Sequence, residues 1–124
     1  MLSWPPTVKI FLGAGPTDMR KGFDSLAHLV ESALTLDPLS GHLFVFRSRR
    51  GDRIKILYWD RDGYAMWYKR LEKGSFRFPV APATSEAKGV EVKAADLMML
   101  LDGVDLGSVR RQRRYCRENV ENPR

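Results

Sequence analysis

The sequence predicts an α+β fold, in which a small, largely antiparallel β-sheet packs against one long amphipathic helix, with one or two shorter helices. Three observations predict it. Segments rich in β-branched and aromatic residues recur between turn residues. A helical apolar stripe runs from Met19 to Leu34. The chain has 124 residues, which is the length of one domain.

The first third of the chain predicts one strand followed by the long helix. Residues 7–12 form the strand candidate, and the Gly- and Pro-rich residues 13–16 end it. Thr17 or Asp18 is expected to cap the helix. Apolar side chains then recur every three or four residues, at Met19, Phe23, Leu26, Ala27, Val30, Ala33 and Leu34. This spacing is typical of a helix with one buried face.

Residues 43–49 and 53–59 predict a β-hairpin, because two strand-like segments flank a turn that contains Gly51. Phe44, Phe46 and Ile54 would share one of its faces. The basic side chains of both strands would gather on the other face.

The hairpin is expected to bring like charges together. If it closes symmetrically about Gly51, Arg49 faces Arg53 and Arg47 faces Lys55. Like charges directly across a strand pair are destabilising. We expect a fold to keep such pairs where phosphate groups neutralise them.

Residues 64–73 are open to two interpretations. The Asp62-Gly63 pair before them favours a strand from Tyr64 to about Lys69. We favour a helix, because Gly74 stands where a helix would end and four apolar residues have helical spacing: Tyr64, Trp67, Tyr68 and Leu71.

The C-terminal part predicts little further structure. Residues 75–79 form a short extended piece, residues 79–89 a loop, and residues 93–101 a short apolar helix that Asp102-Gly103 ends. We therefore expect one compact domain at residues 1–108. Residues 109–124 are polar and Arg-rich, which predicts a basic, flexible tail.

Positive charge is concentrated in three blocks. The formal net charge is +6. Residues 47–55 hold five basic groups and one acidic group, residues 67–77 hold four and one, and residues 110–124 hold six and two. Blocks of this kind point to a polyanionic partner, above all nucleic acid. The alternative is a basic protein whose charge only keeps it in solution.

Groups able to perform catalysis are few. His28 and His42 form no metal-binding pair at helical spacing, and Cys116 lies in the tail without a positioned base. Asp60 and Asp62, with Asp18 or Asp24, could imitate a metal-dependent nuclease site, but their position beside Gly63 is typical of a turn. We therefore expect no enzyme activity, no metal and no cofactor.

The sequence also indicates a compartment. It contains no apolar run long enough to span a membrane and no secretory signal. A single cysteine cannot form an internal disulfide, which fits a reducing cytoplasm.

The candidate nucleic-acid-binding residues are the basic side chains of the three blocks. In the second block, aromatic residues that can stack on bases lie between them. The set comprises Arg47, Arg49, Arg50, Arg53, Lys55, Lys69, Arg70, Lys73, Arg77, Arg110, Arg111, Arg113 and Arg114.

Several motifs resemble a known family. They are residues 18–26 (DMRKGFDSL), residues 43–60 (LFVFRSRRGDRIKILYWD), Gly63-Tyr64, residues 67–74 (WYKRLEKG) and residues 76–79 (FRFP). In order and spacing they are similar to TnpB, the accessory protein family encoded by the second open reading frame of the IS-sixty-six insertion sequences of bacteria. The resemblance implies that the protein accompanies a separate, larger DDE-type transposase and assists transposition. It supplies no catalytic residues.

Three functions follow as hypotheses. The first is a non-catalytic transposition accessory protein that binds DNA, which a contiguous basic surface would favour. The second is an adaptor that docks on the transposase without touching DNA, which an exposed aromatic patch would favour. The third is the nuclease, which converging carboxylates would favour. The choice between DNA and RNA and the oligomeric state stay open.

Overall fold

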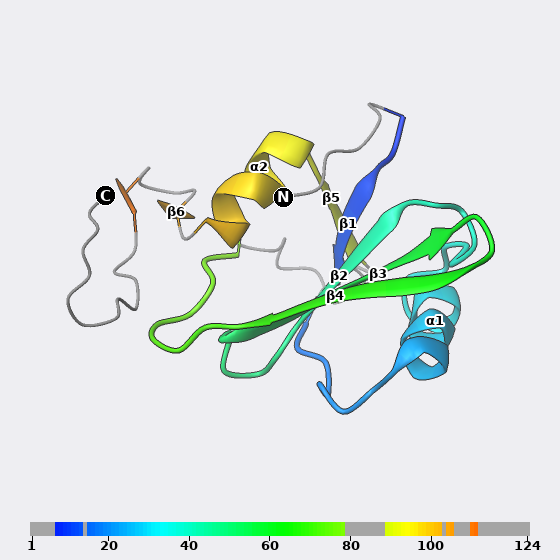
Figure 1. The fold of residues 1–124 in the computed structure, drawn as a ribbon, viewed down its shortest axis with the longest axis horizontal. Coiled ribbons are helices and arrows are strands. Elements are labelled where there is room, and N and C mark those ends of the chain that lie inside the picture. The colour runs from blue at the N-terminus through cyan, green and yellow to red at the C-terminus, as the bar shows by residue number, and fades with distance from the viewer. Residues whose placement is uncertain (1–6, 14, 79–88, 103, 106–109, 112–124) are drawn as a thin grey trace.

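The computed structural model describes residues 7–13, 15–78, 89–102, 104–105 and 110–111 (Figure 1). Its elements are β1 (Ile10–Gly13), α1 (Phe23–Ser32), β2 (Leu43–Arg47), β3 (Arg53–Asp60), β4 (Gly63–Arg70), β5 (Gly89–Val92), α2 (Ala94–Leu101), β6 (Val104–Asp105) and β7 (Arg110–Arg111). Five strands form one sheet in the order β4-β3-β2-β1-β5, and β6 pairs with β7. Only β1 and β2 are parallel in the large sheet, so the predicted α+β class with a largely antiparallel sheet is confirmed.

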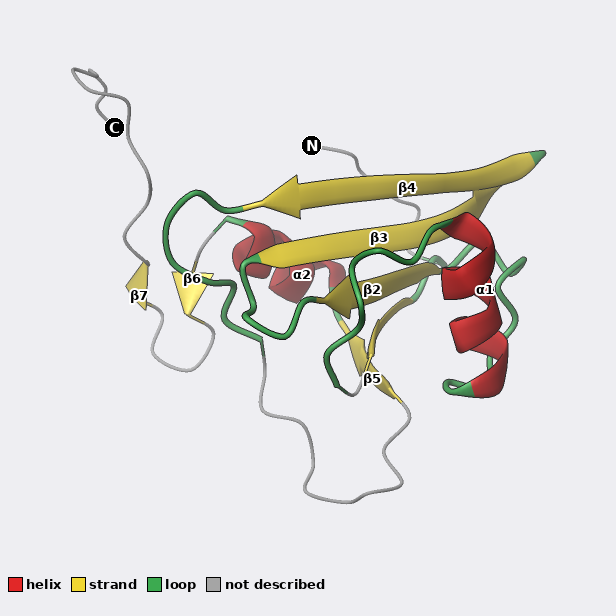
Figure 2. Cartoon of the chain, turned by 90° about the horizontal axis from the view of Figure 1, so that it is seen from below, coloured by secondary structure: helices red, strands yellow, loops and turns green. Residues whose placement is uncertain are grey.

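The two helices cover opposite faces of the sheet (Figures 1 and 2). Successive side chains of a strand point to opposite faces, so each central strand supplies two cores. Val45 and Ile56 pack with Leu97 on the face that α2 covers. Phe44 and Leu57 pack on the face that α1 covers. We call these the α2 face and the α1 face.

The first helix is shorter than the apolar stripe predicts. It has ten residues and begins after Gly22, which caps it without a side-chain hydrogen bond. Asp18 does not cap it, because its Oδ1 accepts a hydrogen bond from the backbone N–H of Arg20, two residues on. Met19 and Leu34 are buried as the stripe predicts, but they lie in the segments that flank the helix.

The predicted helix at residues 64–73 is wrong, because this segment is strand β4. It pairs with β3 in an unbroken antiparallel ladder from Asp60 opposite Gly63 to Arg53 opposite Arg70. The apolar spacing is misleading because β4 contributes to both cores, with Trp67 on the α2 face and Met66 on the α1 face. A strand that packs on both faces loses the simple alternation that reveals a strand in a sequence.

The β2–β3 hairpin forms as predicted, but the predicted register is wrong by one residue. Arg47 lies opposite Ile54, and Phe46 lies opposite Lys55. Ser48 sets this register, since its backbone N–H donates to the carbonyl of Arg53 at 3.0 Å and its Oγ accepts from the N–H of Arg53 at 3.1 Å. A one-residue shift changes the face on which a side chain lies. Arg47 therefore lies on the α2 face and Lys55 on the α1 face.

The C-terminal helix is confirmed as α2, eight residues long, with Leu97, Leu100 and Leu101 buried. Strand β5 was not predicted, because residues before it look like a loop. Among the residues that the structure describes, no helix is long and apolar enough to cross a membrane.

Candidate nucleic-acid interface

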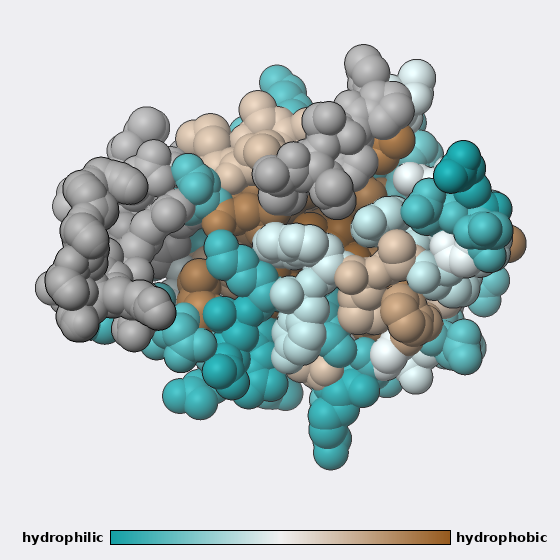
Figure 3. Space-filling view, viewed as in Figure 1, coloured by the Kyte–Doolittle hydropathy of each residue, from teal (hydrophilic) through white to brown (hydrophobic). Residues whose placement is uncertain are grey.

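Backbone hydrogen bonds bring three segments together at one end of the sheet. The first is the segment 16–20 before α1, in which the N–H of Thr17 donates to the carbonyl of Arg47 at 2.8 Å. The second is the β2–β3 loop, residues 48–53. The third is the segment that follows β4. In it, the N–H of Leu71 donates to the backbone carbonyl of Asp52 and the N–H of Phe76 donates to the backbone carbonyl of Gly51, both at 2.8 Å. The first two basic blocks of the sequence therefore meet around this loop. Figure 3 shows hydrophilic side chains gathered at the lower left, where the loop lies in Figure 1.

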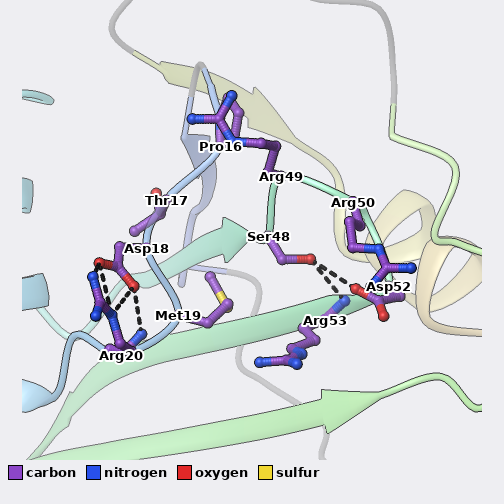
Figure 4. A pocket seen from close by; sticks show the side chains of 10 residues that line it. All are labelled: Pro16, Thr17, Asp18, Met19, Arg20, Ser48, Arg49, Arg50, Asp52 and Arg53. Carbon is purple, nitrogen blue, oxygen red and sulfur yellow. Dashed lines mark hydrogen bonds and ion pairs between the residues drawn. The ribbon is translucent and has the colours of Figure 1, made fainter.

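A pocket of about 430 Å³ lies between the first segment and the loop. Figure 4 shows the side chains around it. Four arginines and two aspartates supply its charge, so the pocket is positive. Its lining residues are Pro16, Thr17, Asp18, Met19, Arg20, Ser48, Arg49, Arg50, Asp52 and Arg53.

Arg20 is already paired. Its Nε and Nη2 donate to the carboxylate of Asp18, the latter at 2.8 Å. The hydrogen bonds from the Arg20 side chain and backbone hold the pKa of Asp18 far below its usual range. The same pair raises the pKa of Arg20. Asp18 thus stays ionised and neutralises Arg20 at any physiological pH.

Arg49, Arg50 and Arg53 differ from Arg20 in this respect. Within the described ranges, none of their guanidinium groups forms an ion pair with a carboxylate. The other pocket carboxylate, Asp52, accepts a hydrogen bond from Ser48 Oγ at 3.1 Å. Arg49 and Arg50 are exposed and Arg53 is half-buried, so the pocket presents three cations that have donors left for an anion.

A like-charge pair does occur across two strands, with different partners from the predicted ones. Arg53 lies directly opposite Arg70 in the β3–β4 ladder. Arg70 is partly neutralised by Glu72, whose Oε2 lies 3.2 Å from its Nη2. The side chains of this pair are exposed by 59% and 55%, so its stabilising effect is small.

Lys55 is a correction to the predicted interface. Its side chain is buried on the α1 face, and the residue is only 7% exposed. Its Nζ donates to the carbonyls of Met19 at 2.7 Å and Lys21 at 2.8 Å, and lies 4.7 Å from the centre of the Tyr68 ring. Lys55 therefore fastens the segment before α1 to the sheet and is not available to a phosphate group.

Two other candidates lie on the α2 face. The guanidinium of Arg47 lies over the ring of Phe78, 5.3 Å from its centre. Lys69 lines a second pocket of about 360 Å³, which also contains Trp67, Met98 and Met99. These two residues are separated from the basic pocket by the sheet.

Comparison with known proteins identifies the family. The sequence model described as "IS66 Orf2 like protein" matches residues 8–111. The chain belongs to the IS66 Orf2-like family. Two relatives from Sinorhizobium fredii (strain NBRC 101917 / NGR234) are similar along most of their length. The protein y4hO is 41% identical over 105 residues, which cover 85% of this chain and 88% of the relative. The protein y4jC is 37% identical over 105 residues, covering 85% and 86%. No solved structure matches the chain.

Family membership identifies this IS66 Orf2-like protein as an accessory protein associated with an insertion sequence. The family is not a known catalytic one. Among the described residues, no group of three or more His, Cys, Asp and Glu side chains could hold a metal ion. Asp60 and Asp62 lie at the β3–β4 turn, at the opposite end of β3 from the pocket that contains Asp18.

The remaining predicted residues of the IS66 Orf2-like chain are only partly described. Lys73 and Arg77 are exposed in the segment that follows β4. Arg110 and Arg111 form β7. Arg113 and Arg114 lie outside the described residues. Sequence reasoning missed Arg20 and considered Asp18 only as a helix cap or a nuclease carboxylate, although an aspartate two residues before an arginine is a pattern that permits this local pairing.

Proposed function

We propose that this chain is a non-catalytic accessory protein of IS66-type transposition and that it binds DNA at the end of the sheet formed by the β2–β3 loop. The basic pocket is the observation that carries the proposal. Arg49, Arg50 and Arg53 place three guanidinium groups around one cavity, and planar guanidinium groups suit phosphate oxygens. The other predicted binding residues near this end of the sheet are Arg70, Lys73 and Arg77.

The repulsion between Arg53 and Arg70 supports the same proposal. Directly opposed like charges destabilise a free sheet by a few tenths of a kcal/mol up to about 1 kcal/mol. A phosphate that lies between them offsets this cost by attracting both. The arrangement is therefore more favourable in a DNA complex than in the free protein.

A salt titration tests this function. If four to six phosphates are contacted, log K should fall with log salt at a slope of about −4 to −5. Binding is measured with a duplex carrying the terminal repeat of the element and with a scrambled duplex, each with and without the transposase. A slope near zero, or no binding at low salt, would contradict the proposal.

The pair between Asp18 and Arg20 makes a second prediction. Replacing Asp18 with Asn retains an oxygen that can accept from the backbone N–H and the Nε of Arg20. It removes one negative charge from the pocket, so the charge of Arg20 is no longer neutralised. We expect DNA affinity to rise and the salt slope to steepen by about 0.9.

Asp37→Asn is the matched control for this variant. Asp37 makes the same kind of local turn, since its Oδ1 accepts from the N–H of Leu39 at 2.9 Å, but it lies outside the pocket. The control should leave the slope unchanged. Equal effects of both variants would show that only total charge matters and that the pocket is not the site.

The alternative function is an adaptor that docks on the transposase without contacting DNA. The second pocket favours it, because Trp67 and the two methionines Met98 and Met99 form an apolar surface beside Lys69. Transposase binding that persists without any DNA affinity would support the adaptor.

A further inference from the structure

Strand β4 forms a long, regular edge of the sheet. It is the outermost strand in the order β4-β3-β2-β1-β5, and Figure 2 shows its outer side along the top of the molecule. Its eight residues pair with β3 without a bulge, and the strand contains no proline. Bulges, prolines and short length are the usual devices that protect a sheet edge from pairing with another strand. Among the described residues, none of these three devices protects β4, and charged side chains, a further device, are confined to its last two residues, Lys69 and Arg70.

The backbone groups that this edge presents can be identified. The N–H of Leu71, directly after β4, donates toward β3 at Asp52. Inward and outward directions alternate along a strand. The N–H and C=O groups of Tyr64, Met66, Tyr68 and Arg70 therefore point outward, where the order of strands leaves them without a partner strand.

The charges at the two ends of the edge are complementary. The β3–β4 turn carries Asp60, Arg61 and Asp62 and is net negative. The other end of β4 carries Lys69 and Arg70, and it stays net positive although Glu72 pairs with Arg70, because Lys73 follows. A parallel strand of a second copy would bring equal charges together. An antiparallel strand brings each acidic turn to the other copy's basic end, so a two-fold arrangement is favoured.

We propose that two copies of this chain pair antiparallel through their β4 edges, with Met66 facing Met66 of the second copy. This register places Asp62 opposite the second copy's Arg70 and the small Ala65 opposite its Trp67. A two-fold axis perpendicular to the sheet relates the two copies, so the α1 faces of both copies lie on the same side of the joined sheet. The outcome is one continuous ten-stranded sheet, twice the five strands of one chain.

The side chains along the edge agree with this register. Tyr68 is 50% exposed, and Tyr64, Met66 and Trp67 are only half-buried. Tyr64 would face the second copy's Tyr68, and aromatic cross-strand pairs stabilise sheets. The register centred on Trp67 would instead oppose two indoles. Dimerisation does not depend on the proposed DNA binding and is measured without DNA.

The test compares two substitutions of one residue in the full chain. Tyr68→Pro removes an outward N–H, which an edge strand tolerates, and so removes two hydrogen bonds from the dimer. Tyr68→Ala removes the same side chain and keeps the N–H. Sedimentation equilibrium should show dimers for the wild type and for Tyr68→Ala and monomers for Tyr68→Pro, with equal far-UV circular dichroism.

A charge exchange keeps the proposal testable if Tyr68→Pro does not fold. Arg70→Asp and Asp62→Arg should each raise the dimer Kd about tenfold, because two symmetry-related ion pairs become repulsive. The double variant that carries both Arg70→Asp and Asp62→Arg should restore the wild-type Kd. A monomeric wild type, as expected if the transposase or residues 112–124 occupy the edge, would overturn the proposal. Dimers that are insensitive to every one of these changes would also overturn it.

Discussion

Replacing Lys55 with Met should destabilise the protein by about 2–3 kcal/mol. The ammonium group of Lys55 donates to two backbone carbonyls, those of Met19 and Lys21, and the substitution leaves both without this donor. A buried acceptor that loses its partner costs about 1–3 kcal/mol. The loss of the contact with the Tyr68 ring adds to this. Burial of the apolar Met side chain offsets part of the cost.

Urea unfolding measures this effect, with Lys69→Met as the matched control. Lys69 carries the same charge one strand away, and no hydrogen bond joins its side chain to another described residue. Its replacement should change stability by less than about 0.5 kcal/mol. Equal stability of the two variants would show that the ammonium of Lys55 is not a structural anchor.

The sign of this prediction is opposite to the one that the sequence suggests. With Lys55 opposite Arg47, removing either would relieve repulsion and stabilise the hairpin. The difference arises from the loop, in which four residues, 49–52, separate the pair formed by Ser48 and Arg53. A symmetrical closure about Gly51 requires one residue fewer between the strands. The hydrogen bonds of Ser48 decide between these two loop lengths, and the pattern of apolar residues does not.

Local patterns predict the parts of the fold that local physics determines. The β2–β3 hairpin and helix α2 appear where turn residues and an apolar run place them. The parallel pairing of β1 with β2 could not be predicted, because its partners are far apart in sequence. The strand character of β4 is hidden for a different reason. Both of its faces carry apolar side chains, and the aromatic residues happen to have helical spacing.

The same distinction applies to the candidate site. That the first two basic blocks belong together follows from the hairpin, since the loop and the end of β4 lie at the same end of the sheet. The separation of these side chains into a pocket, a buried anchor and the α2 face depends on the register. The pairing that neutralises Arg20 depends on the local turn at Asp18. Neither is visible in the distribution of charge along the chain.

Replacing Arg49, Arg50 and Arg53 together with Gln should abolish most of the proposed DNA affinity. Each lost phosphate contact removes about 0.9 from the salt slope, so the slope should flatten by about 2.7. At about 50 mM salt the affinity should fall by a factor of a hundred or more. Stability should not decrease, because none of the three guanidinium groups has an ion-pair partner among the described residues and Arg53 no longer repels Arg70.

The matched control removes the same charge from elsewhere by replacing Lys9, Arg61 and Lys93 with Gln. These residues are exposed and lie outside the pocket, and Arg61 is in the turn at the far end of β3. If DNA affinity arises from the pocket, the control retains most of the salt slope while the pocket variant loses it. Both variants are titrated with the same duplex at several salt concentrations. Equal losses would mean that DNA responds only to the net charge of the chain, and the pocket would then have no special role in binding.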